Sequence, residues 1–159
     1  MQYKTGLVIG RFQPFHLGHK YLAEKALELC ESIIIGIGSS NIKDKKNPYD
    51  VRKRKKFLQE FIKREGIEKR VLKIVEIPDD PDDDVWMMTV SKNVGSFDIS
   101  IGDNDWVNGI FEKAGIPVVK IGFFNRDELE GTKIRGLIKD KKKWEKRVPS
   151  YLVSIIEST

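Results

Sequence analysis

The chain has 159 residues, of which 40% are hydrophobic and 33% charged, and its net charge is +5. This length fits one domain, and the apolar content supports a packed core, which excludes extensive disorder. Apolar runs such as residues 32–38 are far shorter than the roughly 20 residues that span a bilayer. A single cysteine, Cys30, excludes an internal disulfide. We therefore expect a cytoplasmic protein without a membrane segment or a signal peptide.

Short apolar segments alternate with helical patterns along the whole chain. The predicted strands are Thr5–Gly10, Ser32–Gly38, Arg70–Ile77, Phe97–Gly102 and Pro117–Ile121. The predicted helices are Leu17–Glu31, Val51–Glu65 (N-cap Asp50, end at Gly66), Val85–Val94, Trp106–Ala114, Gly131–Lys139 and Pro149–Glu157. Continuous apolar strands indicate a parallel sheet covered on both faces. We predict a single Rossmann-like α/β domain over residues 1–159, with five parallel strands in the order 3-2-1-4-5 and helices on both faces.

The first strand ends in the most unusual segment of the chain. Gly10 is followed directly by residues 11–19, RFQPFHLGH. Ligands of open parallel sheets bind beyond the carboxyl ends of the strands, so this segment lies where a site is expected. Neither the dinucleotide-binding G-x-G-x-x-G nor the P-loop pattern occurs. These absences argue against a hydride-transferring dehydrogenase and a Walker-type kinase.

Two histidines, His16 and His19, lie three residues apart at a predicted strand–loop–helix junction. The amino end of a helix attracts phosphate, and Gly18 would let a phosphate approach the backbone. Imidazole N–H groups, with Arg11 nearby, could stabilise charge on a phosphoryl group. Alternatives are a metal pair, which needs further acidic ligands because the chain has no other histidine, or a purely structural role.

Residues 10–19, GRFQPFHLGH, resemble the H-x-G-H signature of the nucleotidyltransferase superfamily and, more narrowly, of the archaeal-type nicotinamide-nucleotide adenylyltransferases. Four further segments resemble this family in order: Asn47-Pro48-Tyr49 with Arg54, Ile77-Pro78-Asp79 with Trp86, Gly102-Asp103-Asn104, and Gly131-Thr132-Lys133-Ile134-Arg135. The resemblance implies an enzyme of NAD biosynthesis that joins ATP and nicotinamide mononucleotide into NAD and pyrophosphate, with Mg²⁺ and by direct attack on the α-phosphate. Such a transfer asks the protein mainly for positioning and charge neutralisation.

The resemblance also implies site residues. Catalytic contacts to the phosphates are expected from His16, His19, Arg11 and Arg135. ATP-binding residues are expected to be Gly10, Phe12, Gln13, Gly18, Gly38, Ser39, Arg54, Thr132, Lys133 and Ile134. For Thr132 a plain helix N-cap is the alternative, and for Gly38 and Ser39 ordinary turn chemistry.

For the mononucleotide, the resemblance implies Trp86, Phe124, Asp79, Asp83 and Asn104. A pyridinium ring favours an aromatic face, although Trp86 and Phe124 could be ordinary core residues. The two aspartates could accept hydrogen bonds from the carboxamide or ribose, or be solvated loop residues, and family members often carry Asn at the position of Asp83. Asn104 could equally form a turn.

Two charged segments have alternative explanations. The acidic residues 79–84 lack the spacing of a calcium loop, and Mg²⁺ would more readily be held by ATP phosphates and water than by a dedicated protein site. The basic stretch Lys43–Lys56 could bind nucleic acid, but a solvated helix face with a phosphate loop explains it as well. We therefore expect no nucleic-acid partner, and the resemblance implies a homo-oligomer such as a hexamer.

Related activities remain as alternatives. Adenylyltransferases of the same fold act on nicotinate mononucleotide, FMN or phosphopantetheine. The pantetheine, flavin and cytidylyl types carry a small residue and an Asp where this chain has Arg11 and Gln13, which disfavours them. A nucleic-acid-binding module would leave the two histidines unexplained.

Overall fold

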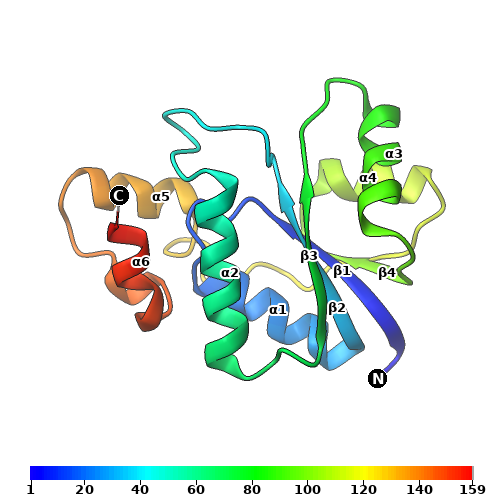
Figure 1. Ribbon diagram of the computed structural model, residues 1–159, viewed down its shortest axis with the longest axis horizontal. Coiled ribbons are helices and arrows are strands. Elements are labelled where there is room, and N and C mark those ends of the chain that lie inside the picture. The colour runs from blue at the N-terminus through cyan, green and yellow to red at the C-terminus, as the bar shows by residue number, and fades with distance from the viewer. Residues whose placement is uncertain (159) are drawn as a thin grey trace.

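A parallel sheet of five strands forms the centre of the protein in the computed structural model, which describes residues 1–158 (Figure 1). Its strands are β1 (Tyr3–Gly10), β2 (Cys30–Gly38), β3 (Val71–Ile77), β4 (Ile99–Ile101) and β5 (Val118–Val119). The order is β3-β2-β1-β4-β5, and every neighbouring pair is parallel. The predicted topology is therefore confirmed, and the strand order reverses between β1 and β4.

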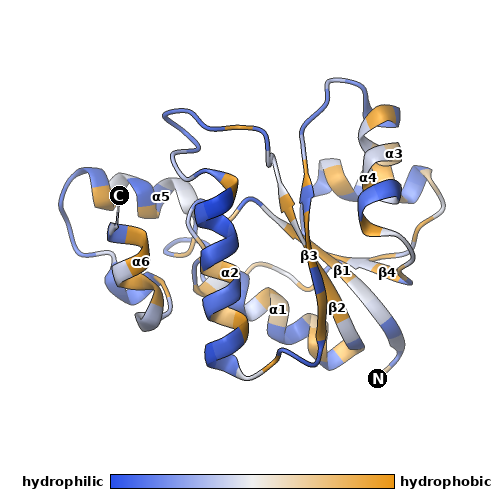
Figure 2. Cartoon of the chain, in the orientation of Figure 1, coloured by the Kyte–Doolittle hydropathy of each residue, from blue (hydrophilic) through white to orange (hydrophobic). Residues whose placement is uncertain are grey.

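Helices cover both faces of the sheet, as predicted (Figure 1). They are α1 (Leu17–Leu29), α2 (Val51–Glu65), α3 (Asp83–Val94), α4 (Asp105–Lys113), α5 (Gly131–Lys139) and α6 (Val153–Glu157), with 3-10 turns at Glu145–Arg147 and Ser150–Leu152. Helices α1 and α2 pack with the C-terminal helices on one face, and α3 and α4 pack on the other. Hydrophobic colour concentrates on the strands between these layers, while the outer face of α2 is hydrophilic (Figure 2).

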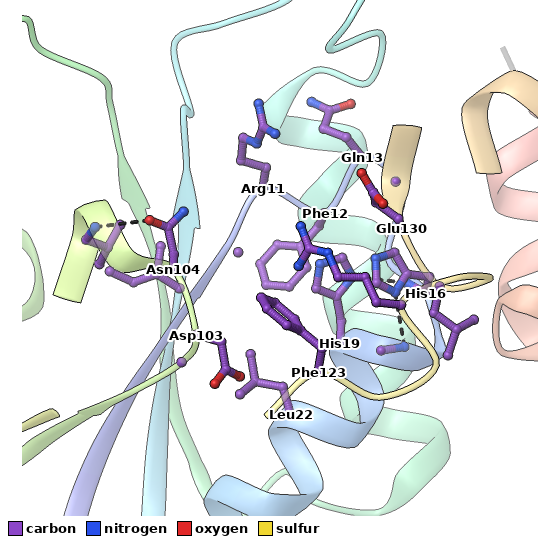
Figure 3. A pocket seen from close by; sticks show the side chains of 18 of the residues that line it. Arg11, Phe12, Gln13, His16, His19, Leu22, Asp103, Asn104, Phe123 and Glu130 are labelled. Carbon is purple, nitrogen blue, oxygen red and sulfur yellow. Dashed lines mark hydrogen bonds between the residues drawn. The ribbon is translucent and has the colours of Figure 1, made fainter. Parts of the chain in front are cut away.

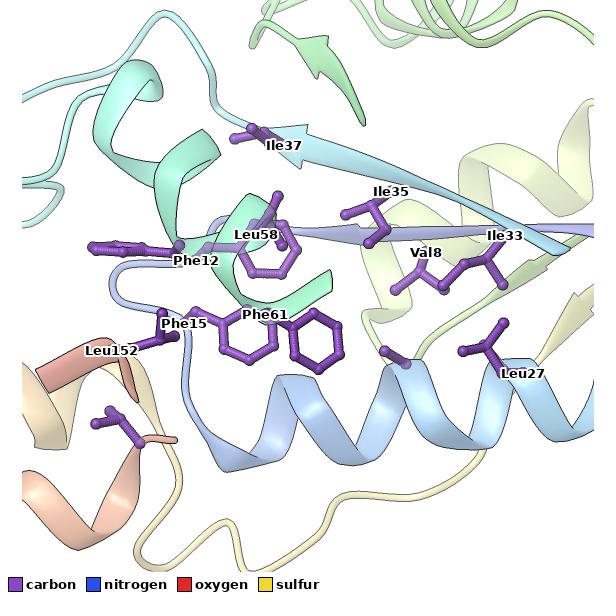
Figure 4. Close-up of a cluster of buried hydrophobic side chains, with 14 of the residues drawn as sticks. Val8, Phe12, Phe15, Leu27, Ile33, Ile35, Ile37, Leu58, Phe61 and Leu152 are labelled. Atoms are coloured by element: carbon purple, nitrogen blue, oxygen red, sulfur yellow. The ribbon is translucent and has the colours of Figure 1, made fainter. Parts of the chain in front are cut away.

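The larger core cluster lies directly behind the loop that follows β1 (Figure 4). Phe15 packs on Phe61 of α2 with ring centroids 4.7 Å apart, and Phe12 lies 5.8 Å from Phe15. All three rings are buried. Burying such large apolar side chains stabilises the fold and fixes the loop backbone that carries His16 and leads into α1.

Several predicted boundaries are wrong by a few residues. Helix α1 ends at Leu29 instead of Glu31, because Cys30 adopts an extended conformation and already belongs to β2. Helix α3 begins at Asp83 instead of Val85, because the Asp82 carboxylate accepts the Asp84 and Val85 N–H groups as N-cap. The predicted strands Phe97–Gly102 and Pro117–Ile121 shorten to Ile99–Ile101 and Val118–Val119, and the terminal helix starts as a 3-10 turn. Among residues 1–158, no helix is long and apolar enough to cross a bilayer.

The N-cap of α2 was predicted from the sequence, and its contribution to stability can be measured. The Asp50 carboxylate accepts the Lys53 N–H at 2.8 Å, as its sequence position predicts. We expect Asp50→Ala to lower the free energy of unfolding by about 1 kcal/mol, because the N–H loses its partner, whereas Asp50→Asn should change it by a few tenths of that. Urea unfolding followed by circular dichroism measures both, and equal losses in the two variants would contradict the assignment of this cap.

Candidate active site

A cavity of about 550 Å³ opens at the carboxyl ends of β1 and β4, where the strand order reverses. Its walls come from residues 9–13, the start of α1 and parts of the segments 100–108 and 121–135, with Ser39, Asp79 and Trp86. Figure 3 shows Asp103 and Asn104 across this cavity from His16 and Gln13. Position and size are those of a small-molecule site in an open α/β sheet.

The cavity collects most of the side chains that the sequence predicted for the site. Those that line it are Gly10, Arg11, Phe12, Gln13, His16, Gly18, His19, Ser39, Asp79, Trp86, Asn104, Phe124, Thr132 and Arg135. They come from segments that are far apart in the chain, so their assembly is a property of the fold. Gly38, Arg54, Asp83, Lys133 and Ile134 do not line it.

The two histidines form a reciprocal cap at the start of α1. His16 is the N-cap residue, and its Nδ1 accepts the Gly18 N–H at 3.0 Å. The His16 N–H donates in turn to Nδ1 of His19 at 3.1 Å. The rings stack with centroids 3.8 Å apart, and Phe12 meets the edge of His19 at 4.8 Å. Because both Nδ1 atoms accept hydrogen bonds, the proton of each neutral imidazole must lie on Nε2.

Both imidazoles are held in the neutral form. Burial, together with the nearby charge of Arg126, lowers the pKa of His16 to about 4. Burial and the neighbouring His16 lower the pKa of His19 well below its ordinary value. Within the described part of the chain, neither Nε2 atom has a hydrogen-bond partner. Neither is fully buried, and both residues line the cavity, so both Nε2 atoms are accessible from it. The pair therefore presents two neutral N–H donors to a ligand.

Gly18 takes part in the cap of α1 as well as lining the cavity. Its N–H is already taken by His16 Nδ1, so it is not a free phosphate donor. A Cβ at this position would lie 2.8 Å from Cε1 and 2.9 Å from Nδ1 of His16. Gly18 therefore makes room for the imidazole that caps the helix, and a larger residue in this chain would force that ring to shift.

Two arginines approach the same part of the cavity. Arg135 on α5 donates to the Gln13 carbonyl at 2.6 Å and to Thr132 Oγ1 at 3.3 Å. Arg11 donates to Asn47 Oδ1 at 3.5 Å. Burial and the charge of Arg11 lower the pKa of Arg135, so the two guanidinium groups repel one another. Such a pair of guanidinium groups at one end of the cavity suits a polyanion.

Thr132 and Asn104 have local partners as well. Glu130, and not Thr132, is the N-cap residue of α5, which excludes the plain N-cap alternative for Thr132. The Asn104 carboxamide oxygen accepts the Val107 N–H at 3.1 Å and caps α4. The Asn104 amide group still lines the cavity, so a cap and a ligand contact are compatible there.

Ser39 and Asp79 connect the ends of β2 and β3. The Ser39 hydroxyl donates to Asp79 Oδ1 at 2.9 Å, and Ser39 has a positive φ of 50°. Both residues line the cavity. The hydrogen bond leaves the second carboxylate oxygen of Asp79 available to a ligand.

Aromatic side chains surround the cavity opening. Trp86 is only 2% exposed and packs against Trp106, whose ring is half exposed, with centroids 5.5 Å apart. Phe124 stacks on Tyr21 at 4.6 Å, and Arg126 lies 3.9 Å over the ring of Phe123. The surface available to a flat ligand ring near Trp86 is therefore mainly that of Trp106.

Arg54 was expected among the ATP-binding residues, but it does not line the cavity. Its side chain is 0% exposed. The guanidinium donates to the carbonyl groups of Arg11 (3.1 Å), Gly38 (2.9 Å) and Ser39 (3.1 Å), with longer contacts to those of Ile42 and Asp50. It therefore supports the loops after β1 and β2, because carbonyls beyond the strands have no ladder partner.

The other four expected residues also lie off the cavity. Gly38 offers its carbonyl to Arg54, and Ile134 is fully buried in the core. The Lys133 amine donates to the Asp127 carbonyl at 3.1 Å and approaches Glu130 at 3.8 Å. Asp83 belongs to the exposed first turn of α3. The matched motifs therefore contain supporting residues as well as residues that face the cavity.

The sequence reasoning missed several lining residues, notably Trp106, Asp103, Phe123 and Arg126. Asp103 accepts the Gly122 N–H at 3.0 Å, so it anchors the segment that carries Phe123 and Arg126. Among these four, only Asp103 and Trp106 had a sequence signal of proximity to the site, because they follow the end of a predicted strand. Phe123 and Arg126 lie in a loop whose path no local pattern predicts.

A protein-built metal cage is absent from residues 1–158, because no three His, Cys, Asp or Glu side chains gather there in a way that could hold an ion. The two histidines are instead committed through Nδ1 to main-chain N–H groups.

Comparisons with known proteins agree with this geometry. A family model described as cytidylyltransferase-like matches residues 7–135. A nicotinamide-nucleotide adenylyltransferase of Archaeoglobus fulgidus is 35% identical over 154 residues, which cover 94% of this chain and 88% of that protein. The protein of the same name from Thermococcus sibiricus is 34% identical, with coverages of 96% and 82%. The chain belongs to the nicotinamide-nucleotide adenylyltransferase family of the cytidylyltransferase-like proteins.

Solved structures share the fold at lower identity. A bifunctional NMN adenylyltransferase/ADP ribose pyrophosphatase of Francisella tularensis, crystallised with AMP and a manganese ion, superposes with a TM-score of 0.75 at 22% identity. The match covers 92% of this chain but only 44% of that one. A putative nicotinate-nucleotide adenylyltransferase of Vibrio parahaemolyticus has a TM-score of 0.65 at 16% identity, with coverages of 98% and 99%. Both likenesses concern the fold alone.

The contact between Gly18 and His16 gives a first test of the site in this member of the adenylyltransferase family. We expect Gly18→Ala to displace the His16 ring, and thereby to reduce turnover by at least about tenfold and stability by about 1 kcal/mol. Gly136→Ala on α5 is the matched control, because a Cβ there meets nothing within 4 Å. That control should be neutral or stabilising by about 0.5–1 kcal/mol. Full activity in Gly18→Ala would refute the packing argument.

The protonation state of the imidazoles can be observed directly, because the chain has only two histidines. We expect ¹⁵N-detected NMR to show both as neutral Nε2–H tautomers from pH 8 to pH 5.5. A midpoint near 6.5 for either ring would contradict the structure.

The same shift makes stability depend on pH. The unfolded chain takes up protons near pH 6.5 while His16 in the folded chain stays neutral down to about pH 4. Folded stability should therefore be lost as pH falls from 6.5 to 4, by up to about 1.4 kcal/mol per pH unit for each histidine. Replacement of His16 by Asn should reduce the dependence of the free energy of unfolding on pH, as measured by urea unfolding at several pH values.

Proposed function

We propose that this chain joins ATP and nicotinamide mononucleotide to give NAD and pyrophosphate. The observation that carries the proposal is the pair of neutral Nε2–H donors beside Arg11 and Arg135, in a cavity at the switch point of the sheet. Membership of the family and the names of relatives at 35% and 34% identity support the same reaction.

In this reaction an oxygen of the mononucleotide phosphate attacks the α-phosphorus of ATP. A new P–O bond forms, the bond from the α-phosphorus to the bridging oxygen breaks, and the electron pair leaves with pyrophosphate. A covalent enzyme intermediate on histidine is disfavoured, because the Nε2 that faces the cavity carries the proton and its lone pair is not available. The protein acts instead by orientation and by stabilising charge.

Each cationic or N–H group has a defined task in this scheme. His16 and His19 donate to the α-phosphate oxygens, where negative charge grows in the transition state. Arg11, Arg135 and Thr132 hold the β- and γ-phosphates and stabilise the departing pyrophosphate. Arg126, which lines the same cavity, is an additional phosphate ligand in this proposal.

The mononucleotide ring would be held by aromatic and polar side chains. We place the pyridinium against Trp106, with Trp86 buried behind it, because a cationic ring favours the face of an indole. Asp79 and Asn104 would bind ribose or carboxamide groups. Phe124 would close the opening of the cavity, through its stack on Tyr21.

We propose Mg²⁺ as the partner of ATP. Residues 1–158 form no three-ligand cluster, which fits an ion that keeps its waters and is held by phosphate oxygens. When bound, it would neutralise phosphate charge. Assembly into a homo-oligomer, and cytoplasmic location, stay predictions.

An assay with separate acceptors tests the function. The protein is incubated with ATP, Mg²⁺ and, in turn, nicotinamide mononucleotide, nicotinate mononucleotide, FMN and phosphopantetheine, and pyrophosphate and product are measured. We expect the highest kcat/KM with nicotinamide mononucleotide, and His19→Ala should reduce kcat by about 100-fold or more, while the circular dichroism spectrum stays unchanged. Turnover of another acceptor alone would replace the substrate assignment.

A further inference from the structure

Gln13 lies in the cavity wall, but its side chain is committed to the main chain of another loop. It is only 3% exposed. Its amide Nε2 donates to the Tyr49 carbonyl at 2.8 Å, and its Oε1 accepts the Tyr49 N–H at 3.0 Å. Both ends of the amide are thus paired with one residue, in the manner of a short strand contact. This pairing joins the loop after β1 to the loop before α2.

The loop that contains Tyr49 also contacts Arg11, one of the two arginines assigned to the phosphates. Asp44 Oδ1 accepts the main-chain N–H of Asn47 at 2.8 Å and its side-chain amide at 3.0 Å. The buried Asn47 then offers its own Oδ1 to the Arg11 guanidinium. Because Tyr49 is only two residues away, a displacement of Tyr49 would also move the Asn47 oxygen that meets Arg11.

The main chain of Gln13 is held in addition to its side chain. Its carbonyl accepts a hydrogen bond from Arg135 at 2.6 Å. Between Arg11 and Gln13 the backbone turns through Phe12, which has a positive φ of 56°, a conformation that a phenylalanine keeps only when its surroundings enforce it. Gln13 therefore connects Arg11 on one side with Arg135 on the other.

These two arginines repel each other in the absence of a ligand, since the charge of Arg11 contributes to the lowered pKa of Arg135. Holding them on one cavity wall needs a rigid frame that does not itself carry charge. A neutral amide with both ends paired meets that requirement, whereas a carboxylate at the same place would attract the guanidinium groups away from a ligand.

We propose that Gln13 is a positioning residue, which fixes Arg11 and Arg135 for the triphosphate through its paired contact with Tyr49, and not a direct ATP ligand. The proposal rests on the proposed function for the identity of ATP. It assigns to Gln13 a different role from the direct contact that its place in the motif suggested.

The test uses Gln13→Met, which keeps the volume of the side chain but removes both hydrogen bonds. Binding of ATP and of adenosine to the full chain is measured by calorimetry. We expect the affinity for ATP to fall about tenfold, a change of ~1.4 kcal/mol, while that for adenosine changes less than about twofold. Gln59→Met on the exposed face of α2 is the matched control and should change neither. Equal losses for both ligands, or no loss, would overturn the proposal.

A double-mutant cycle separates positioning from direct contact. If Gln13 acts through the arginines, Gln13→Met should have little further effect on ATP affinity in an Arg11→Ala, Arg135→Ala background. Full additivity would show a direct contact and reject the proposal.

A second variant of this residue, Gln13→Glu, keeps the acceptor for the Tyr49 N–H but adds a charge, and should weaken ATP binding more than Gln13→Met does. Weaker impairment by Glu than by Met would also count against the proposal. These measurements need no turnover, so a failure to form NAD would affect the proposed function without deciding the role of Gln13.

Discussion

The site depends on two hydrogen bonds at the start of α1, from the Gly18 N–H to His16 Nδ1 and from the His16 N–H to His19 Nδ1. They satisfy main-chain donors that the first turn of a helix leaves without partners. They also fix the tautomer of both rings, so the atom that remains for a ligand is a donor on each. The same two side chains therefore cap the helix and supply the N–H donors for a ligand. The geometry of a capping box sets the two residues that separate them.

This arrangement requires a rigid support, because a capping imidazole is useful to a ligand only if the chain before it is fixed. Phe15 anchors the loop in the core against Phe61. Arg54 binds the carbonyls that emerge from β1 and β2, and Gln13 pairs with Tyr49. Loops beyond strand ends cannot satisfy their polar groups through a ladder, so buried polar side chains take over that task. Arg54 and Gln13 thus supply hydrogen bonds to these loops that a strand ladder cannot give.

The sequence predicts the architecture well, because continuous apolar strands and amphipathic helices leave few arrangements for a chain of this length. It also identifies His16 and His19, since they lie in the loop and first helical turn that follow the end of β1. Roles inside a motif are less accessible: Arg54 and Gln13 match the family pattern, yet they bind main-chain groups. Phe123 and Arg126 were missed because they reach the cavity through the path of a loop, which depends on tertiary contacts and not on spacing along the chain.

The fold also determines how charge is distributed within the cavity. Arg11, Arg126 and Arg135 supply permanent positive charge, while the imidazoles stay neutral across the physiological range. The arginines therefore neutralise phosphate charge, and the imidazoles donate hydrogen bonds to the reacting group. Because different side chains perform these two tasks, a change in pH would not remove both tasks together. Asp79 and Asp103 line the same cavity, and Figure 3 places Asp103 across from His16. A ligand that combines anionic phosphates with a cationic ring matches this distribution, because it can place each charge beside its opposite. Under the proposed function, the mononucleotide acceptor is such a ligand.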